Sequence, residues 1–168
     1  YTSYLKIAEG CSNHCSYCAI PTIRGKARSR ELEDILMEAE HLVMGGVREL
    51  IITAQDTTAY GCDLKGKPNL ANLLKELASI QGIHWIRLLY THPAGLTDEI
   101  LKSVNRHESI CKYIDIPIQH IDDEILAAMN RRGDSSLIKK TIQQARDLIP
   151  GVALRTSIIV GFPGETRV

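Results

Sequence analysis

The sequence predicts an α/β fold built on a mostly parallel sheet, and three observations support this prediction. Short apolar runs alternate with amphipathic stretches along all 168 residues, without a low-complexity segment. The run Val47 to Ala54 holds three consecutive large aliphatic residues, Leu50 to Ile52, which is typical of a strand buried on both faces. Strands separated by crossover helices run parallel with right-handed connections. Two architectures remain open, a doubly wound sheet and a section of a (β/α) barrel.

The first expected strand, Tyr4 to Ala8, leads into a cysteine-rich loop, and a helix follows this loop. Ser29 is expected to cap the helix, because acidic residues suited to a helix start come directly after it. Gly45 and Gly46 supply the stop signal. The apolar stripe of this helix has the spacing of one face and consists of Leu32, Ile35, Leu36, Ala39, Leu42 and Val43.

The same alternation continues to the end of the chain and gives five strands in total. After the strand at 47–54, the further expected strands are Trp85 to Tyr90, Tyr113 to Ile118 and Val152 to Val160. The helices between them are expected from about Asn69, after Thr97, around Ile125 to Met129, and from Leu137 to Ile149. The chain stops soon after the fifth strand, so we expect at least one more strand in a parent protein.

Polar segments follow the expected strands, and in a parallel sheet they gather at its carboxyl edge. That edge is where ligands bind in both architectures. The segments are the cysteine loop, residues 55–58, 91–93 and 119–120, and the glycine-proline loop at 161–165. We therefore expect the functional site at this edge.

Composition and charge exclude several classes of protein. Twenty Lys and Arg balance twenty Asp and Glu, which argues against a general binder of phosphate backbones. Five cysteines are too few for a disulfide scaffold and cannot pair completely, so a reducing compartment is expected. No apolar run has the length of a membrane span, and no leader is visible. The chain opens on Tyr1, which indicates an excised piece whose upstream targeting signals lie outside this sequence.

Cys11, Cys15 and Cys18 form a C-x3-C-x2-C triplet within one loop, so their thiolates can converge on one metal centre. Zinc held by these cysteines and His14 is one alternative, although structural zinc sites normally draw on two distant ligand pairs. The cysteines of bacterial ferredoxins follow a different spacing, C-x2-C-x2-C-x3-C before a proline, so the triplet does not match that class of protein. The spacing favours an iron–sulfur cubane held by three thiolates, with its fourth iron left open.

The triplet, with Tyr17 before its last cysteine, resembles the signature of the radical S-adenosylmethionine enzymes. Further stretches resemble the methylthiotransferase branch of that superfamily, and together they cover nearly the whole chain: residues 19–25, 29–30, 54–61, 115–120 and 159–166. Within the branch, Gln55-Asp56-Thr57-Thr58 and Leu154-Arg155-Thr156-Ser157 resemble the members that act on an aspartate of small-subunit ribosomal protein twelve. The members that act on a prenylated tRNA adenosine typically have Gln-Asn-Val at the first of these places.

The resemblance implies a partial (β/α) TIM-like barrel of the radical SAM type, with parallel strands and truncated after about five strands. It implies that Cys11, Cys15 and Cys18 bind a [4Fe–4S] cluster, whose open iron is chelated by S-adenosylmethionine. No catalytic residue is expected beyond this cluster site. The residues implied to contact S-adenosylmethionine are Tyr17 against the adenine, Gln55 and Asp56 at the methionyl amino group, and Gln119 and Arg155 at the ribose and carboxylate ends.

The resemblance also implies a larger protein, in which residues 1–168 are the radical SAM core domain. An upstream domain would carry a second [4Fe–4S] cluster, and a downstream β-barrel domain would contact substrate. The implied function is a cytoplasmic transferase that adds a methylthio group to the aspartate β-carbon. Its partners would be the ribosomal protein or the small subunit and a flavodoxin-type reductant, with no membrane.

Two alternatives to this function stay open at this point. The first is the tRNA-modifying relative, with tRNA as the partner. The second belongs to another class and is a non-catalytic, metal-stabilised binding module. His92 and His120 lie at expected strand ends, where they could touch substrate, and neither is expected to be catalytic.

Overall fold

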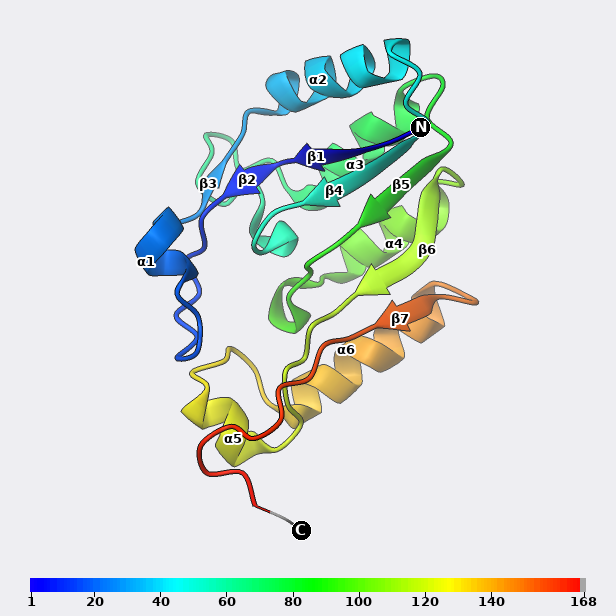
Figure 1. The fold of residues 1–168 in the computed structure, drawn as a ribbon. Coiled ribbons are helices and arrows are strands. Elements are labelled where there is room, and N and C mark those ends of the chain that lie inside the picture. Colours follow the sequence, from blue (N-terminus) through cyan, green and yellow to red (C-terminus); the bar gives the residue numbers. More distant parts are fainter. Residues whose placement is uncertain (167–168) are drawn as a thin grey trace.

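A single parallel sheet forms the centre of the computed structural model, which describes residues 1–166 (Figure 1). Its five strands, in chain order, are β1 (Thr2–Lys6), β4 (Glu49–Thr53), β5 (Trp85–Leu88), β6 (Ile110–Asp115) and β7 (Ala153–Arg155). The order across the sheet is β1-β4-β5-β6-β7, so each strand pairs with the next one along the chain. A doubly wound sheet reverses its order at a switch point. The observed order therefore confirms a section of a (β/α) barrel.

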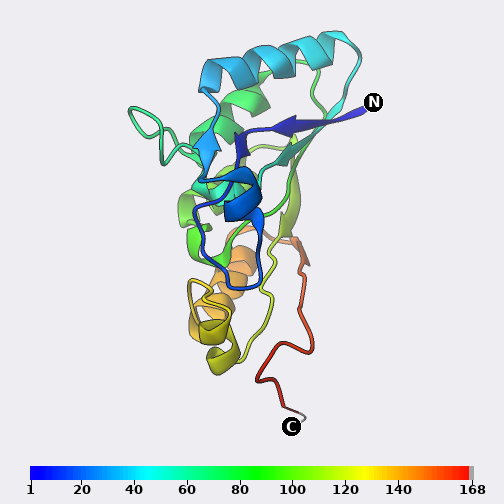
Figure 2. The same cartoon turned by 60° about the vertical axis from the view of Figure 1, so that its left-hand side comes forward.

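The crossover helices lie on one face of the sheet, as the two ribbon views show (Figures 1 and 2). They are α2 (Leu32–Met44), α3 (Leu70–Ser79), α4 (Asp98–Arg106) and α6 (Ser135–Leu148). Each of these helices contacts the next one along the chain. Helix α2 also contacts strand β1, and helix α4 contacts strand β6. Their apolar faces bury the core, which includes Leu50, Ile52, Leu73 and Leu74. The predicted stripes thus pack as expected.

Helices α3 and α4 begin where the sequence predicts, and Asn69 and Thr97 cap them. Oδ1 of Asn69 accepts a hydrogen bond from the Asn72 amide at 2.9 Å, and Oγ1 of Thr97 accepts from the Ile100 amide at 3.3 Å. The short helix α5 (Asp123–Ala128) and the helix α6 begin with aspartate caps at Asp122 and Asp134. These caps satisfy amide groups that the helix itself leaves free.

Ser29 is not the cap of α2, so that prediction is wrong. The helix starts after Glu31, which makes no side-chain cap. Ser29 belongs to β3 (Arg28–Ser29), which pairs antiparallel with β2 (Ala8–Glu9). Its hydroxyl accepts a hydrogen bond from the Gly61 amide at 2.9 Å, and this distant donor takes the oxygen that a cap would need.

Strand β4 is fully buried on one face only, contrary to the prediction for residues 47–54. Leu50 and Ile52 face the helices and are fully buried, whereas Ile51 points to the other side and is half-buried. Tyr4 pairs with Ile51 in register and is 66% exposed. The difference arises because the helices cover the outer face, while the inner face of a five-stranded section stays open.

Three expected strands end earlier in the structure, because the chain bends out of the sheet at its carboxyl edge. After β5, Tyr90 takes a positive φ of 56°, a conformation that turns the chain. After β6, Pro117 has no amide hydrogen for a ladder. The last expected strand contains the short β7, followed by an isolated bridge between Gln119 and Ile158. These bends place polar side chains above the sheet edge.

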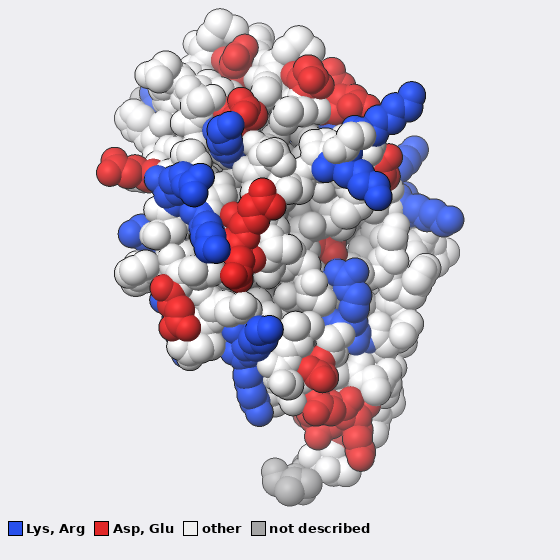
Figure 3. Space-filling view, turned by 180° about the vertical axis from the view of Figure 1, so that it is seen from behind, with Lys and Arg blue, Asp and Glu red and all other residues white. Residues whose placement is uncertain are grey.

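Three short elements complete the described chain. Helix α1 (Ile20–Arg24) follows the cysteine loop, and the turns η1 (Thr57–Ala59) and η2 (Pro93–Gly95) follow β4 and β5. Within residues 1–166, no helix has both the length and the apolarity needed to cross a bilayer. Lys and Arg side chains are interspersed with Asp and Glu over the face drawn in Figure 3, in keeping with the balanced charge.

Candidate active site

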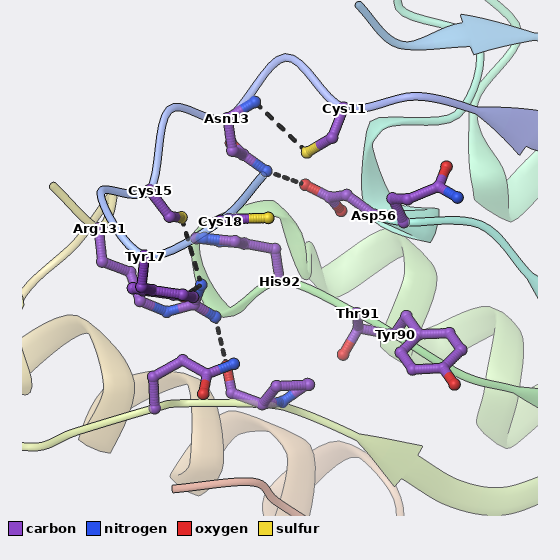
Figure 4. A pocket seen from close by; sticks show the side chains of 13 residues that line it. Cys11, Asn13, Cys15, Tyr17, Cys18, Asp56, Tyr90, Thr91, His92 and Arg131 are labelled. Atoms are coloured by element: carbon purple, nitrogen blue, oxygen red, sulfur yellow. Dashed lines mark hydrogen bonds between the residues drawn. The ribbon is translucent and has the colours of Figure 1, made fainter. Parts of the chain in front are cut away.

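A cavity of about 180 Å³ opens at the carboxyl edge of the sheet (Figure 4). It lies between the cysteine loop and the segments that follow β4, β5, β6 and α5. The residues that line it are Cys11, Asn13, Cys15, Tyr17, Cys18, Gln55, Asp56, Tyr90, Thr91, His92, Pro117, Gln119 and Arg131. All three predicted metal ligands and four of the five predicted cofactor contacts are therefore brought together.

The cysteine loop runs from β2 to α1 and is closed at its base by a glycine. The Cys11 amide donates to the Gly25 carbonyl at 3.1 Å. Gly10 has φ of 78°, and a Cβ there would lie 2.3 Å from the Lys26 carbonyl oxygen, so the two backbones can meet only at a glycine. The thiols of Cys11, Cys15 and Cys18 are half-buried and line the same cavity.

A hydrogen bond from Asn13 ties the cysteine loop to the sheet. Nδ2 of Asn13 donates to Oδ2 of Asp56 at 2.7 Å, and the Asn13 amide donates to Sγ of Cys11 at 3.4 Å. The other carboxylate oxygen of Asp56 accepts from the amide and hydroxyl of Thr58. Burial raises the pKa of the Cys11 thiol, and the Asn13 amide partly offsets this by stabilising the thiolate.

The end of α5 holds the loop from the opposite side. The Ser16 amide donates to the Met129 carbonyl at 2.9 Å, and Nδ2 of Asn130 donates to the His14 carbonyl at 2.8 Å. Arg131 donates to the Tyr17 hydroxyl at 3.1 Å and lies 3.8 Å from Sγ of Cys15. Sequence reasoning assigned Arg131 no functional role, and the basic turn at 130–133 was its one visible signal.

Tyr17 lies on the cavity wall. Burial raises the pKa of its hydroxyl to about 12, against the opposing effect of the nearby Arg131 charge. Its hydroxyl therefore stays protonated at neutral pH. The ring can present a face to a ligand while the hydroxyl is held by Arg131.

Gln55 and Gln119 enter the cavity from the ends of β4 and β6. Nε2 of Gln55 donates to Glu9 at 3.1 Å, and its Oε1 is buried without a protein partner. Gln119 has φ of 72°, and its backbone is held on both sides by the segment after β7, through Ser157 and Ile159. Both side chains are therefore placed by a fixed backbone at the cavity edge.

Arg155 is not among the cavity-lining residues. Its Nη1 forms an ion pair with Oδ1 of Asp115 at 2.9 Å, and the Asp115 side chain is fully buried. Oδ2 of Asp115 accepts from the Tyr90 amide at 3.1 Å. The pair thus joins the ends of β6 and β7 to the bend after β5.

His92 also lies in the cavity wall and is only 4% exposed. Its Nδ1 accepts from the Ala94 amide at 3.2 Å, whereas its Nε2 is buried without a partner. Burial lowers the pKa of the imidazole to about 4, and the positive charge of Arg131 acts in the same direction. The ring is therefore neutral near pH 7.

The arrangement does not favour a zinc site with His14 as fourth ligand. His14 is exposed and is not among the residues that line the cavity. Within residues 1–166, no three His, Cys, Asp or Glu side chains come close enough to enclose one metal ion. A cubane suits the wider arrangement, because each thiolate then binds a different iron.

Comparison with known proteins agrees with this geometry. The model of the Radical SAM superfamily matches residues 5–168. The ribosomal protein uS12 methylthiotransferase RimO of Syntrophus aciditrophicus is 67% identical over 166 residues, which make up 99% of this chain and 37% of that protein. RimO of Geobacter sulfurreducens is 57% identical over 167 residues, with the same coverage. The chain therefore spans 37% of the length of these curated relatives.

Solved structures share the fold at low sequence identity. The radical S-adenosylmethionine methyltransferase TsrM of Kitasatospora setae, solved with cobalamin and a [4Fe-4S] cluster, has a TM-score of 0.76 and 19% identity. The match covers 98% of this chain and 32% of that one. For coproporphyrinogen III oxidase HemN of Escherichia coli, the TM-score is 0.65 and the identity is 18%. This match covers 98% of the present chain and 38% of HemN. With a family model over nearly all of its length and a partial barrel of the same fold, the chain belongs to the radical SAM superfamily.

Proposed function

We propose that this chain is the core of an enzyme that methylthiolates an aspartate β-carbon of ribosomal protein uS12. One observation carries the proposal: three cysteine thiols open onto a cavity in a chain that is 67% identical to a uS12 methylthiotransferase. Gln55 and Asp56, which begin the stretch that resembles the protein-modifying relatives, line the same cavity.

The cavity fits a polar cofactor that offers both hydrogen-bond donors and acceptors. Four buried side-chain atoms within residues 1–166 lack a hydrogen-bond partner, and three of them belong to cavity residues: Gln55, His92 and Arg131. Buried polar groups normally have partners, so these atoms indicate a ligand that completes them. A second hollow of about 390 Å³ shares Cys11, Cys18, Gln55 and Tyr90 with the first, which extends the space for it.

In the proposed enzyme, Cys11, Cys15 and Cys18 hold a [4Fe–4S] cluster with one open iron. When bound there, the cluster supplies the electron that cleaves S-adenosylmethionine and so starts the radical chemistry.

The remaining residues position the two cofactors. Tyr17 presents its ring to the adenine, and Oε1 of Gln55 accepts a hydrogen bond from the methionyl ammonium. Asp56 adds negative charge near that ammonium and fixes the loop through Asn13. Gln119 contacts the ribose or carboxylate end, and Arg155 supports this end through Asp115. In the longer protein, the neighbouring domains would close this edge of the sheet and exclude water from the reacting centre.

The longer protein would contain an upstream domain with a second [4Fe–4S] cluster and a downstream β-barrel domain. Their absence from residues 1–168 agrees with the 37% coverage of the relatives. The proposed enzyme works in the cytoplasm on the ribosomal protein or the small subunit, and a flavodoxin-type protein supplies electrons.

Mass spectrometry of cells that lack the full-length protein tests the function. We expect ribosomal protein uS12 to lose the mass of one methylthio group, and complementation to restore it. Loss of a methylthio group from a tRNA nucleoside, with uS12 unchanged, would instead establish the tRNA-modifying alternative.

Metal content tests the site independently of the substrate. Anaerobic reconstitution of the full-length protein should give about four irons for this site, and Cys15→Ser should remove them. Cys62→Ser is the matched control, because Cys62 is exposed and is not a lining residue of the cavity. Stoichiometric zinc without iron would support the non-catalytic binding module and contradict the proposed enzyme.

A further inference from the structure

His92 carries a hydrogen-bond donor that the protein itself leaves unused. The side chain is 4% exposed, and its Nε2 lacks a partner although it lies in the cavity wall. Buried polar atoms without partners are rare in folded proteins and call for a specific explanation.

The hydrogen bond at the other ring nitrogen decides which nitrogen carries the proton. The Ala94 amide donates to Nδ1, so Nδ1 offers a lone pair and the hydrogen of the neutral ring is on Nε2. The backbone before the ring is also fixed. Both the amide and the hydroxyl of Thr91 donate to the Asp115 carbonyl, at 3.0 and 2.6 Å. Nε2–H is therefore a donor with a fixed direction.

The groups around His92 show what kind of acceptor is missing. Arg131 lies on the same cavity, and its Nε is also buried without a partner. Asp56, the nearby anion, is already bonded to Asn13 and Thr58. Figure 4 shows the imidazole extending from the sheet edge toward the cysteine loop. Two unused donors thus border the cavity that the three thiols line, and they call for a hydrogen-bond acceptor.

We propose that His92 is a positioning residue whose Nε2–H donates a hydrogen bond to a sulfur of the centre held by Cys11, Cys15 and Cys18. Arg131 supports the same centre from the Cys15 side. The inference rests on the proposed cluster. A donor to a cluster sulfur stabilises the reduced, more negative state, so His92 raises the reduction potential.

Two substitutions separate this donor from the structural role of the ring. In His92→Asn, the side-chain oxygen can take the place of Nδ1 and keep the Ala94 hydrogen bond, but no donor reaches the place of Nε2. In His92→Gln, the longer side chain places its amide nitrogen near the position of Nε2, while the bond to Ala94 is lost. A purely structural role therefore predicts the opposite order of effects from a donor role.

The test is an EPR-monitored redox titration of the reconstituted full-length protein with dithionite, without S-adenosylmethionine. We expect wild-type iron content in both variants, a midpoint potential shifted to more negative values in His92→Asn, and recovery toward wild type in His92→Gln. An unchanged potential in His92→Asn, or equal shifts in both variants, would overturn the inference. Several-fold weaker S-adenosylmethionine binding in His92→Asn without a potential shift would also overturn it, because the donor would then serve that ligand.

A measurement on the wild-type protein guards against poor folding of the variants. Pulsed EPR of the reduced cluster, with ¹⁵N-labelled histidine, should detect a weakly coupled ¹⁵N nucleus that is lost in His92→Gln. Absence of the coupling from wild type overturns the inference. Absence of a [4Fe–4S] signal altogether is a different result and contradicts the proposed function.

Discussion

Asn13 and Asp56 join the cysteine loop to the end of β4 through a 2.7 Å hydrogen bond between residues 43 positions apart. Asp56 is the buried partner, and the loop contributes the amide. The contact orients the loop so that the Cys11 thiol enters the cavity, because the Asn13 amide also donates to that sulfur.

Replacing Asn13 by Ala should loosen this attachment. A hydrogen bond to a charged group contributes about 1.5–3 kcal/mol, so we expect a loss of that size in the free energy of unfolding and weaker iron retention. Denaturant titration and iron analysis measure the two effects. Thr2→Ala is the control, because its bond to Glu49 is exposed. Equal effects from the two substitutions would contradict the role given to Asn13.

Gly10→Ala should disrupt the base of the cysteine loop. Both Gly10 and Gly25 have positive φ, so alanine is strained at either position, by about 1–3 kcal/mol. At Gly10 the new Cβ would also meet the Lys26 carbonyl at 2.3 Å, whereas at Gly25 nothing lies within 4 Å. We expect a further ~1–3 kcal/mol of destabilisation, and loss of iron, for Gly10→Ala only. Equal unfolding free energies for the two variants would show that the close approach is unimportant.

Arg155→Ala should affect stability more than cofactor affinity. It leaves the fully buried Asp115 carboxylate without its ion-pair partner, so we expect a lower free energy of unfolding. The loss is limited because the Arg155 side chain is 55% exposed and solvent screens the pair. Gln119→Ala, at a cavity residue, should weaken S-adenosylmethionine binding instead. Calorimetric titration and thermal unfolding compare the two variants. If Arg155→Ala weakens binding more strongly than Gln119→Ala at unchanged stability, Arg155 contacts the cofactor directly.

The stability of the cluster-free protein should depend on pH through His92. Its pKa is lowered to about 4 in the folded chain, from an ordinary value of 6.5. Between these values the unfolded chain binds a proton that the folded chain does not, so stability falls as the pH drops from about 6.5 toward 4. The contribution is up to about 3 kcal/mol. Denaturant titrations from pH 7.5 to 4.5 should show a smaller decline in His92→Gln, and parallel curves would refute the assignment.

The sequence predicts features that depend on neighbours along the chain, and it fails where distant partners compete. Asn69 and Thr97 cap their helices because the amides they serve are three residues away. Ser29 has the same capping chemistry, but the Gly61 amide, 32 positions away, takes its hydroxyl. The apolar content of β4 correctly predicts that Leu50 and Ile52 are buried. That the other face of β4 is open follows only from the three-dimensional structure, in which helices cover one face of the sheet.

The cavity residues, too, are predictable where the signal is local and are missed where a distant partner decides their role. The cysteine spacing is a local signal, and it identified all three thiols that line the cavity. Arg131 has only the weak signal of a basic turn, because its partner Tyr17 lies 114 positions away in the sequence. Arg155 lies at the expected sheet edge, yet the buried Asp115 on the adjacent strand binds its guanidinium. Such ion pairs between strands depend on register, which the sequence pattern does not specify.

The clamp formed by α5 on the cysteine loop determines when the cavity can be completed during synthesis. Cys11 to Cys18 are made before residues 128–131, but Ser16 of their loop donates hydrogen bonds to the carbonyls of Ala128 and Met129, and Arg131 donates to the Tyr17 hydroxyl. Until that segment has been made and has folded back, the three thiols remain on an incompletely fixed loop. Cluster insertion is therefore best suited to a chain that has already grown past Arg131.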